Sequence, residues 1–371
     1  MATGAGVQVQ GSGQATVAVF PANYFDDPNL RLAFDGPKKF SIDEAGAKKL
    51  NAKANTPLAY VQSLQADLAT LNYLPAGAAD GVYAAGTKRA VLIFQRHAAR
   101  VYRMPGPSDV QPGQTFQGAA DGICDQATAK EIQVWIGSKF VRPVGRFATR
   151  SLNVAGAIPR NKLREDAADE WEAIVAQVAA AGGILTGESQ GYGDTLRTLS
   201  KQVAAKKAGA SSFSFHFAGR AIDIDQGFGG GKGQRYFIVK ETVGTDTFWR
   251  LFCKTDKQDG TQGTKMAKGA LQRMTDMVNQ KSADIPAGSY IDMTAMIEAS
   301  GKFSRIHAQS DFNNTALPAG ARYNKTEWWH FQYMVDVQQT FQDEMELIGI
   351  TEKQLKAAGW TTEAELDHRP G

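Results

Sequence analysis

The sequence lacks a long apolar run, since no stretch approaches the roughly 18 apolar residues that a membrane-spanning helix needs. It also lacks a basic segment followed by an apolar one at its start, where the first basic residue is Arg31. A secretory signal has that pattern. The sequence therefore predicts a chain that is synthesised in the cytoplasm without a signal peptide and is not inserted in a membrane.

Cysteine is scarce, and the two cysteines, Cys124 and Cys253, form no CxxC motif. This excludes a cysteine zinc site or a redox motif, and each thiol is expected to pack as a small apolar side chain. The net charge of +3 is small, and we expect no nucleic-acid partner. The 371 residues, 43% of them hydrophobic and 21% charged, are typical of a soluble globular protein with two domains, expected to be a monomer.

Acidic residues are missing from one internal segment, 132–164, which contains seven basic residues. Such a segment can contact an anionic polymer, or it can be an ordinary solvated linker. We predict four parts for the chain. They are an N-terminal arm of unknown role at 1–56, a helical domain at 57–137, a basic linker at 138–160, and a larger domain at 161–371.

Residues 57–137 show helical periodicity, with apolar residues at Val61, Leu64, Leu68 and Leu71. A turn signal follows at Asp80-Gly81, and Thr87 is predicted to cap the next helix. The same pattern recurs 41 residues later at Asp121-Gly122, Thr128, Ile132 and Trp135. The sequence therefore predicts three short helices, each of which needs a partner to bury its apolar face.

This string resembles the peptidoglycan-binding domain that is found at the ends of many wall hydrolases. The matching residues run from Val61 through Asp80-Gly81-Val82-Tyr83 to Phe94-Gln95, and Asp121-Gly122-Ile123 resembles the closing half. The resemblance implies that bacterial peptidoglycan is a partner. The alternative is a generic three-helix domain without a ligand. The sequence departs from the family between His97 and Ala120, where an insertion lies, and His97 is expected at the surface.

The segment from Ser214 to Asp225 holds the first candidate functional residues. Its alternation from Ala221 onward predicts a strand on which Asp223 faces away from the neighbouring isoleucines. His216 precedes Gly219, where the chain can turn sharply. One imidazole and one carboxylate can therefore converge on a single point.

A second segment, from Glu327 to His330, contains two tryptophans and precedes a predicted strand at 332–335. Two imidazoles and one carboxylate are a common catalytic zinc set, which leaves the fourth position to water. Amide hydrolysis by metal-activated water also needs a proton shuttle, a role that Glu327 can fill as general base. Trp328 and Trp329 would exclude water and raise the basicity of that carboxylate.

The pattern Ser-x-His-x-x-Gly-x-Ala-x-Asp, followed by Glu-x-x-His, resembles the D-Ala-D-Ala carboxypeptidase and dipeptidase class of metallopeptidases, which is related to lysostaphin. The resemblance implies an α+β fold with an antiparallel sheet. It also implies that His216, Asp223 and His330 bind Zn2+ and that Glu327 is the general base.

The same family places an arginine after a strand and upstream of the first zinc ligand, where it holds the substrate carbonyl or carboxylate. Gly193 stands where that arginine usually follows Gly-Tyr, and Arg197 lies four residues further on, after a predicted strand at 184–186. Arg197 is therefore the candidate for oxyanion or carboxylate binding. The alternative is an exposed helix arginine.

The connection between Asp223 and Glu327 is longer than a compact site needs, and predicts an inserted segment at 226–300 with a helix near Met266–Met277. We expect a zinc-dependent peptidoglycan peptidase, either an endopeptidase such as one for L-Ala-D-Glu or a D-Ala-D-Ala carboxypeptidase. The alternative is a non-catalytic zinc-containing protein that binds the cell wall. An enzyme made without a signal would reach the wall after phage lysis or by export through a secretion machine.

Overall fold

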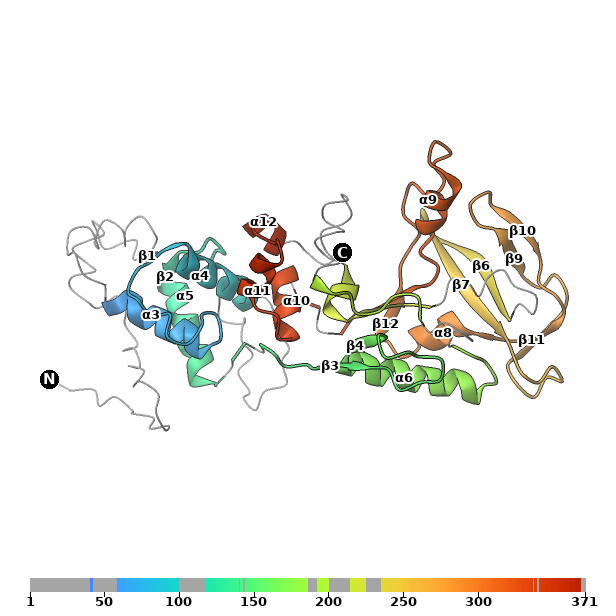
Figure 1. The fold of residues 1–371 in the computed structure, drawn as a ribbon, viewed down its shortest axis with the longest axis horizontal. Helices are drawn as coiled ribbons and strands as arrows, with labels where there is room; N and C mark the ends of the chain where they lie inside the picture. Colours follow the sequence, from blue (N-terminus) through green and yellow to red (C-terminus); the bar gives the residue numbers. More distant parts are fainter. Residues whose placement is uncertain are drawn as a thin grey trace. The chain divides into compact units, whose positions relative to one another are not determined.

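The computed structural model describes residues 41–42, 59–99, 116, 118–139, 141–142, 144–185, 192–199, 214–224, 235–335, 337–338 and 340–367. The chain divides into two compact units between Val144 and Gly145 (Figure 1). Most of the predicted N-terminal arm, 1–56, lies outside the described residues, and Ser41–Ile42 forms strand β1. The whole is a mixed helical and antiparallel α+β structure, as predicted.

The described residues of the first unit contain three helices, α3 (Ala59–Thr70), α4 (Ala85–Ala98) and α5 (Gln126–Gly137). Strand β1 pairs with β2 (Cys124–Asp125), which leads directly into α5. The apolar residues that repeat along the sequence form one buried core, including Val61, Leu68, Val91, Phe94, Ile132 and Trp135. The predicted three-helix unit is therefore confirmed, because the helices bury their apolar faces against each other.

Two buried glutamines hold the two Asp-Gly turns of this unit. The Gln65 amide donates to Asp80 Oδ1 (2.8 Å) and Thr87 Oγ1 (2.9 Å), and its carbonyl accepts from the Gly81 N–H (2.8 Å). Gln95 makes the equivalent bonds at the second turn, to Asp121 (3.3 Å), Thr128 (3.0 Å) and Gly122 (2.8 Å). Gln65 lies 15 residues before Asp80, whereas Gln95 lies 26 residues before Asp121. The extra residues therefore lie between Gln95 and the second turn, and the bonds at the two turns stay equivalent.

Two predictions for this unit are wrong. Thr87 and Thr128 are not helix caps, because α4 begins after Ala84 and α5 after Asp125, whose carboxylate accepts from the Thr128 N–H. Both threonines are buried and serve the glutamines instead. His97 is buried rather than exposed, with its Nδ1 2.8 Å from the Tyr73 hydroxyl oxygen.

The second unit begins with a hairpin of β3 (Thr149–Ser151) and β4 (Lys162–Arg164), followed by helix α6 (Glu165–Ala180). Part of the predicted linker, 138–160, is therefore a strand of this unit, because β3 finds its pairing partner beyond the linker. The strand predicted at 184–186 does not form at Ile184 and Leu185, which lie in an irregular segment, and Thr186 is outside the described residues.

A three-stranded antiparallel sheet lies at the centre of the second unit. Its order is β12 (Phe303–Arg305), β13 (His330–Tyr333) and β5 (Ala221–Asp223). Trp171 of α6 packs edge-on against Phe303, at 5.2 Å between ring centroids, and is fully buried. The apolar face of α6 therefore closes one side of the core on which this sheet rests.

Within the predicted insertion, 226–300, residues 236–292 form a six-stranded antiparallel sheet in the order β10-β9-β6-β7-β11-β8, coloured yellow to orange in Figure 1. Its strands are β6 (Tyr236–Val243), β7 (Asp246–Lys254), β8 (Thr264–Met266), β9 (Gln272–Asp276), β10 (Lys281–Asp284) and β11 (Gly288–Asp292). The helix predicted near Met266–Met277 is wrong, because that stretch forms β8 and β9. Strand β8 pairs with β11, and β9 pairs with β6 and β10. Strand pairing with distant residues outweighs a local apolar pattern there.

Short helices complete the second unit. Helix α8 (Met293–Glu298) follows β11, and α9 (Ala319–Asn324) precedes β13. The C-terminal helices α10 (Phe341–Leu347), α11 (Glu352–Ala357) and α12 (Glu363–Leu366) pack on the 3-10 turn η1 (Phe215–Ala218). The tail thus supports the segment that carries His216.

A buried ion pair joins these helices to η1 and β5. Arg220 follows η1, and its guanidinium donates to both oxygens of Glu344 in α10, at 2.7 and 3.0 Å. Arg164 Nη1 approaches the same carboxylate at 3.9 Å, and all three side chains are fully buried.

The two cysteines are free and buried in the cores of the two different units, as predicted. Within the described residues, no helix has the length and apolar character that crossing a membrane requires.

Candidate metal centre

Strand pairing brings the first two candidate ligands together. In the β13–β5 ladder, His330 is the direct partner of Asp223, 107 residues away in sequence. Their side chains project from the same face, and His330 Nδ1 lies 2.8 Å from Asp223 Oδ1. Opposite residues of an antiparallel pair always share a face, so the backbone ladder itself fixes this contact.

The third candidate, His216, is held by the η1 turn. Ser214 begins the turn, and Gly219 ends it in the left-handed region at φ 66°. A side chain at Gly219 would meet the Arg164 backbone nitrogen at 2.7 Å, so the predicted sharp turn requires glycine. The turn points His216 Nε2 at Asp223 Oδ1 (3.1 Å) and at His330 Nδ1 (3.2 Å).

The other ring nitrogen of His216 faces a backbone carbonyl. His216 Nδ1 lies 2.8 Å from the oxygen of Thr195, which can only accept, so Nδ1 donates to it and Nε2 is the nitrogen that faces the other two candidate ligands. The segment around Thr195 is fixed in turn by Asp223, whose N–H donates to the Asp194 oxygen (2.8 Å) and whose oxygen accepts from the Gly193 N–H (2.9 Å). This is the outer support that metal-binding histidines usually have.

The donor set fits zinc. A tetrahedral ion with bonds of about 2.0 to 2.1 Å holds its ligand atoms about 3.3 Å apart. The three separations of 2.8, 3.1 and 3.2 Å are slightly shorter, and the three residues are at most 7% exposed. The structure thus brings together the three predicted ligands, His216, Asp223 and His330, as a group that could hold a metal ion.

The electrostatics of the cluster favour an ionised carboxylate. Burial by itself raises the pKa of Asp223, but the charge and hydrogen bonds of His216 and His330 outweigh burial and hold the pKa below its usual range. An ionised aspartate between two imidazoles carries the negative charge that a divalent cation requires.

Glu327 lies beside this cluster in an unusual backbone conformation. Its φ is 53°, in the left-handed region that residues other than glycine rarely adopt. Its backbone oxygen accepts from the His330 N–H (3.1 Å), and its Oε1 accepts from the Gln309 amide (2.9 Å). Burial raises the pKa of the Glu327 carboxyl, although the charges of His330 and Arg197 oppose this. Glu327 is therefore a half-buried carboxylate with raised basicity, next to the candidate ligands.

Arg197 is near the centre but is already engaged. Its Nε donates to Asp194 Oδ2 (2.7 Å), and its guanidinium lies 5.5 Å from the centre of the Phe217 ring. Its backbone N–H donates to the His216 oxygen (3.0 Å), and its charge acts on Glu327. The side chain is 25% exposed and lies outside the helices of the described residues, so the exposed-helix alternative for Arg197 is wrong.

Three supporting residues carried no sequence signal. Thr195 acts through its backbone oxygen, which any residue type provides. Gln309 contacts Glu327 across 18 residues of chain, and Glu344 reaches Arg220 across 124. His307 lies just after β12, is exposed, and its Nδ1 faces the Ala308 oxygen (2.9 Å), so it stands outside the cluster.

Comparison with known families supports the first unit. Residues 59–99, which span α3, the first Asp-Gly turn and α4, match the family model of the peptidoglycan binding domain. The chain therefore contains a peptidoglycan-binding domain, which supports peptidoglycan as a partner. The matched stretch includes both glutamines that hold the turns, Gln65 and Gln95. Comparison with curated proteins and with solved structures gave no match for the chain.

Proposed function

We propose that the protein is a zinc-dependent peptidase that hydrolyses an amide bond in the peptide part of peptidoglycan. The observation that carries the proposal is the position of Glu327. Its carboxylate, with a raised pKa, lies beside three convergent metal donors. Its backbone conformation costs about 1–2 kcal/mol for a residue other than glycine. A site that served only to hold a metal would gain nothing from that cost.

The chain's own groups divide the chemistry. His216, Asp223 and His330 would hold the zinc ion, which when bound supplies a Lewis acid for amide hydrolysis. Glu327 takes a proton from the attacking water and delivers it to the leaving amine, and its raised pKa suits both transfers. Arg197 carries a positive charge close to Glu327, where it favours the developing oxyanion or a substrate carboxylate.

The first unit would serve as an anchor. Peptidoglycan is insoluble, and a binding domain on the same chain raises the effective concentration of the peptidase near its substrate. This arrangement favours an endopeptidase, such as one that cuts L-Ala-D-Glu or a D-Ala crosslink, over a D-Ala-D-Ala carboxypeptidase that acts on free peptides.

The decisive experiment is digestion of purified peptidoglycan by the zinc-loaded full-length protein, with mass spectrometry of the soluble fragments. We expect new amine and carboxylate ends at one type of peptide bond, and no such ends with Glu327→Gln. The contrary outcome is peptidoglycan that stays intact after incubation, although the protein binds it and contains one zinc. That outcome would refute the peptidase function and support a non-catalytic wall-binding protein.

A further inference from the structure

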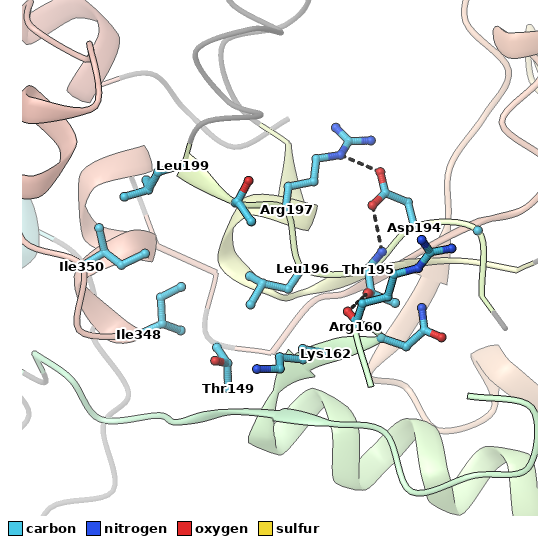
Figure 2. A pocket seen from close by; sticks show the side chains of 13 residues that line it. Thr149, Arg160, Lys162, Asp194, Thr195, Leu196, Arg197, Leu199, Ile348 and Ile350 are labelled. Carbon is cyan, nitrogen blue, oxygen red and sulfur yellow. Dashed lines mark hydrogen bonds and ion pairs between the residues drawn. The ribbon is translucent and has the colours of Figure 1, made fainter. Parts of the chain in front are cut away.

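The second unit has a cavity of about 740 Å³ beside the segment 193–199 (Figure 2). None of the three candidate zinc ligands lines it, and neither does Glu327. Its walls come from three stretches far apart in sequence, at 149–162, 193–199 and 348–350. A cavity of this size falls in the range of small-ligand sites, which is about 300–1,000 Å³.

The lining has an apolar part and a cationic part. Figure 2 shows Leu199, Ile348 and Ile350 together on one side of the cavity, with Arg160 and Asp194 on the other. Lys162 lies between them, and Leu196 projects from the middle of the segment. A ligand that fills this space would therefore need an aliphatic part and a charged part.

The charged part must be an anion. The lining contains three basic side chains, those of Arg160, Lys162 and Arg197, and one carboxylate, that of Asp194. The lining therefore has an excess of two positive charges. Asp194 is already committed to Arg197 Nε (2.7 Å) and to the Thr195 N–H (3.0 Å). Arg160 and Lys162 are exposed and make no ion pair with any carboxylate in the part of the chain that the structure describes. Unpaired cations at the mouth of a partly apolar cavity favour a carboxylate ligand.

The cavity adjoins the candidate metal centre through its backbone. The Thr195 oxygen faces His216 Nδ1, and the Arg197 N–H donates to the His216 oxygen. The segment that lines the cavity therefore also positions the first candidate ligand. The cavity and the candidate centre therefore share one supporting segment.

We propose that this cavity is a subsite for a short peptide with a free carboxylate, which Arg160 and Lys162 bind while Leu199, Ile348 and Ile350 contact its aliphatic groups. The inference rests on the proposed peptidase function, because it makes the cavity a part of the same substrate path. It assigns substrate selection to residues that are not zinc ligands, and it predicts a preference for stem peptides whose carboxylates are free over those whose carboxylates are amidated.

The test measures binding by calorimetry with the zinc-loaded full-length Glu327→Gln protein, so that no cleavage interferes. The probes are a synthetic stem tetrapeptide with free carboxylates and the same peptide with each carboxylate amidated. We expect the acid to bind more tightly, and the double variant Arg160→Gln/Lys162→Gln to weaken acid binding by about tenfold. Binding of the amidated peptide should not change, and added salt should reduce the difference.

The matched control is Lys257→Gln/Lys268→Gln, which removes the same charge from exposed positions outside the cavity. Zinc content and thermal unfolding show whether each variant is folded. Equal binding of the acid by the double variant and this control overturns the subsite, even if the wild type cleaves peptidoglycan. Conversely, selective loss of acid binding in the double variant, together with a zinc-loaded wild-type protein that cleaves no peptidoglycan, supports the subsite and refutes the peptidase.

Discussion

His330 and Asp223 are direct partners in the β13–β5 ladder, with His330 Nδ1 2.8 Å from Asp223 Oδ1. Two of the three candidate ligands are thus held by the backbone pairing of two adjacent strands, with His330 on the central strand and Asp223 on the edge strand β5. The third, His216, comes from a turn that Gly219 ends and that the C-terminal helices cover. The centre depends on long-range packing at every ligand, which leads to the following expectations.

Replacing His216 by alanine should abolish tight zinc binding, because two donors cannot complete the set. The loss should exceed the roughly 10–100-fold that removal of an outer supporting partner costs. Elemental analysis after dialysis measures the zinc content. His307→Ala is the control, since that histidine is exposed and outside the cluster. Full zinc occupancy in His216→Ala would remove His216 from the ligands.

Replacing Glu327 by glutamine should leave zinc content unchanged and lower turnover by about 10²–10⁴-fold, the usual contribution of a general base. The amide keeps the shape and the contact with Gln309 but cannot accept the proton from water. Release of soluble fragments from peptidoglycan measures turnover. Wild-type rates in a zinc-loaded Glu327→Gln protein would exclude Glu327 as the base.

Replacing Glu327 by glycine should abolish turnover as well, yet yield a more stable protein than Glu327→Gln, by about 0.5–1 kcal/mol. Glycine adopts the φ of 53° without strain, whereas the glutamine variant keeps the strain that glutamate has there. Urea unfolding of the two variants gives the difference. A less stable glycine variant would show that the backbone at 327 stores no strain.

Replacing Glu344 by glutamine should destabilise the second unit by about 3–5 kcal/mol, because it leaves the buried Arg220 without its paired carboxylate, whereas Arg164 keeps its ion pair with Asp166 (2.7 Å). Zinc affinity should fall with it, since Arg220 lies between His216 and Asp223 in the chain. Glu352→Gln is the control, because its partner Lys356 is half exposed and such pairs contribute about 0.3–0.5 kcal/mol. Equal unfolding midpoints for the two variants would contradict this role.

Replacing Gln65 by alanine should destabilise the first unit by about 2–4 kcal/mol, because it leaves the buried Thr87 hydroxyl and the Gly81 N–H without their partner. Binding to purified peptidoglycan should weaken at temperatures where the unit unfolds. Gln62→Ala makes the same change at an exposed position of the same helix and should have little effect. Thermal unfolding followed by circular dichroism compares the two, and identical curves would exclude the glutamine as a support of the turn.

Deleting residues 1–144 should weaken binding to peptidoglycan while leaving cleavage of a small soluble stem peptide intact. The deletion ends at the boundary between the two compact units, so it removes no part of the second core. Cosedimentation with peptidoglycan measures binding, and chromatography of the peptide measures cleavage. Equal losses in both would argue against a separate anchor.

Sequence alone predicted the features that are local. Apolar spacing gave the three helices of the first unit, and the Asp-Gly turns gave its repeat. Gly219 indicated a sharp turn before Asp223. The resemblance of two short motifs to a metallopeptidase class singled out His216, Asp223 and His330 as ligands and Glu327 as the base, because zinc chemistry restricts its donors to few side chains.

Tertiary structure alone decided what depends on pairs of residues far apart. It turned the predicted helix near Met266–Met277 into strands, because β-strands are specified by partners rather than by their own periodicity. It buried His97, and it joined Arg220 to Glu344 across 124 residues. It also placed Asp223 opposite His330. Such contacts leave no periodic signal, since each is set by how separate segments pack and not by the residues next to them.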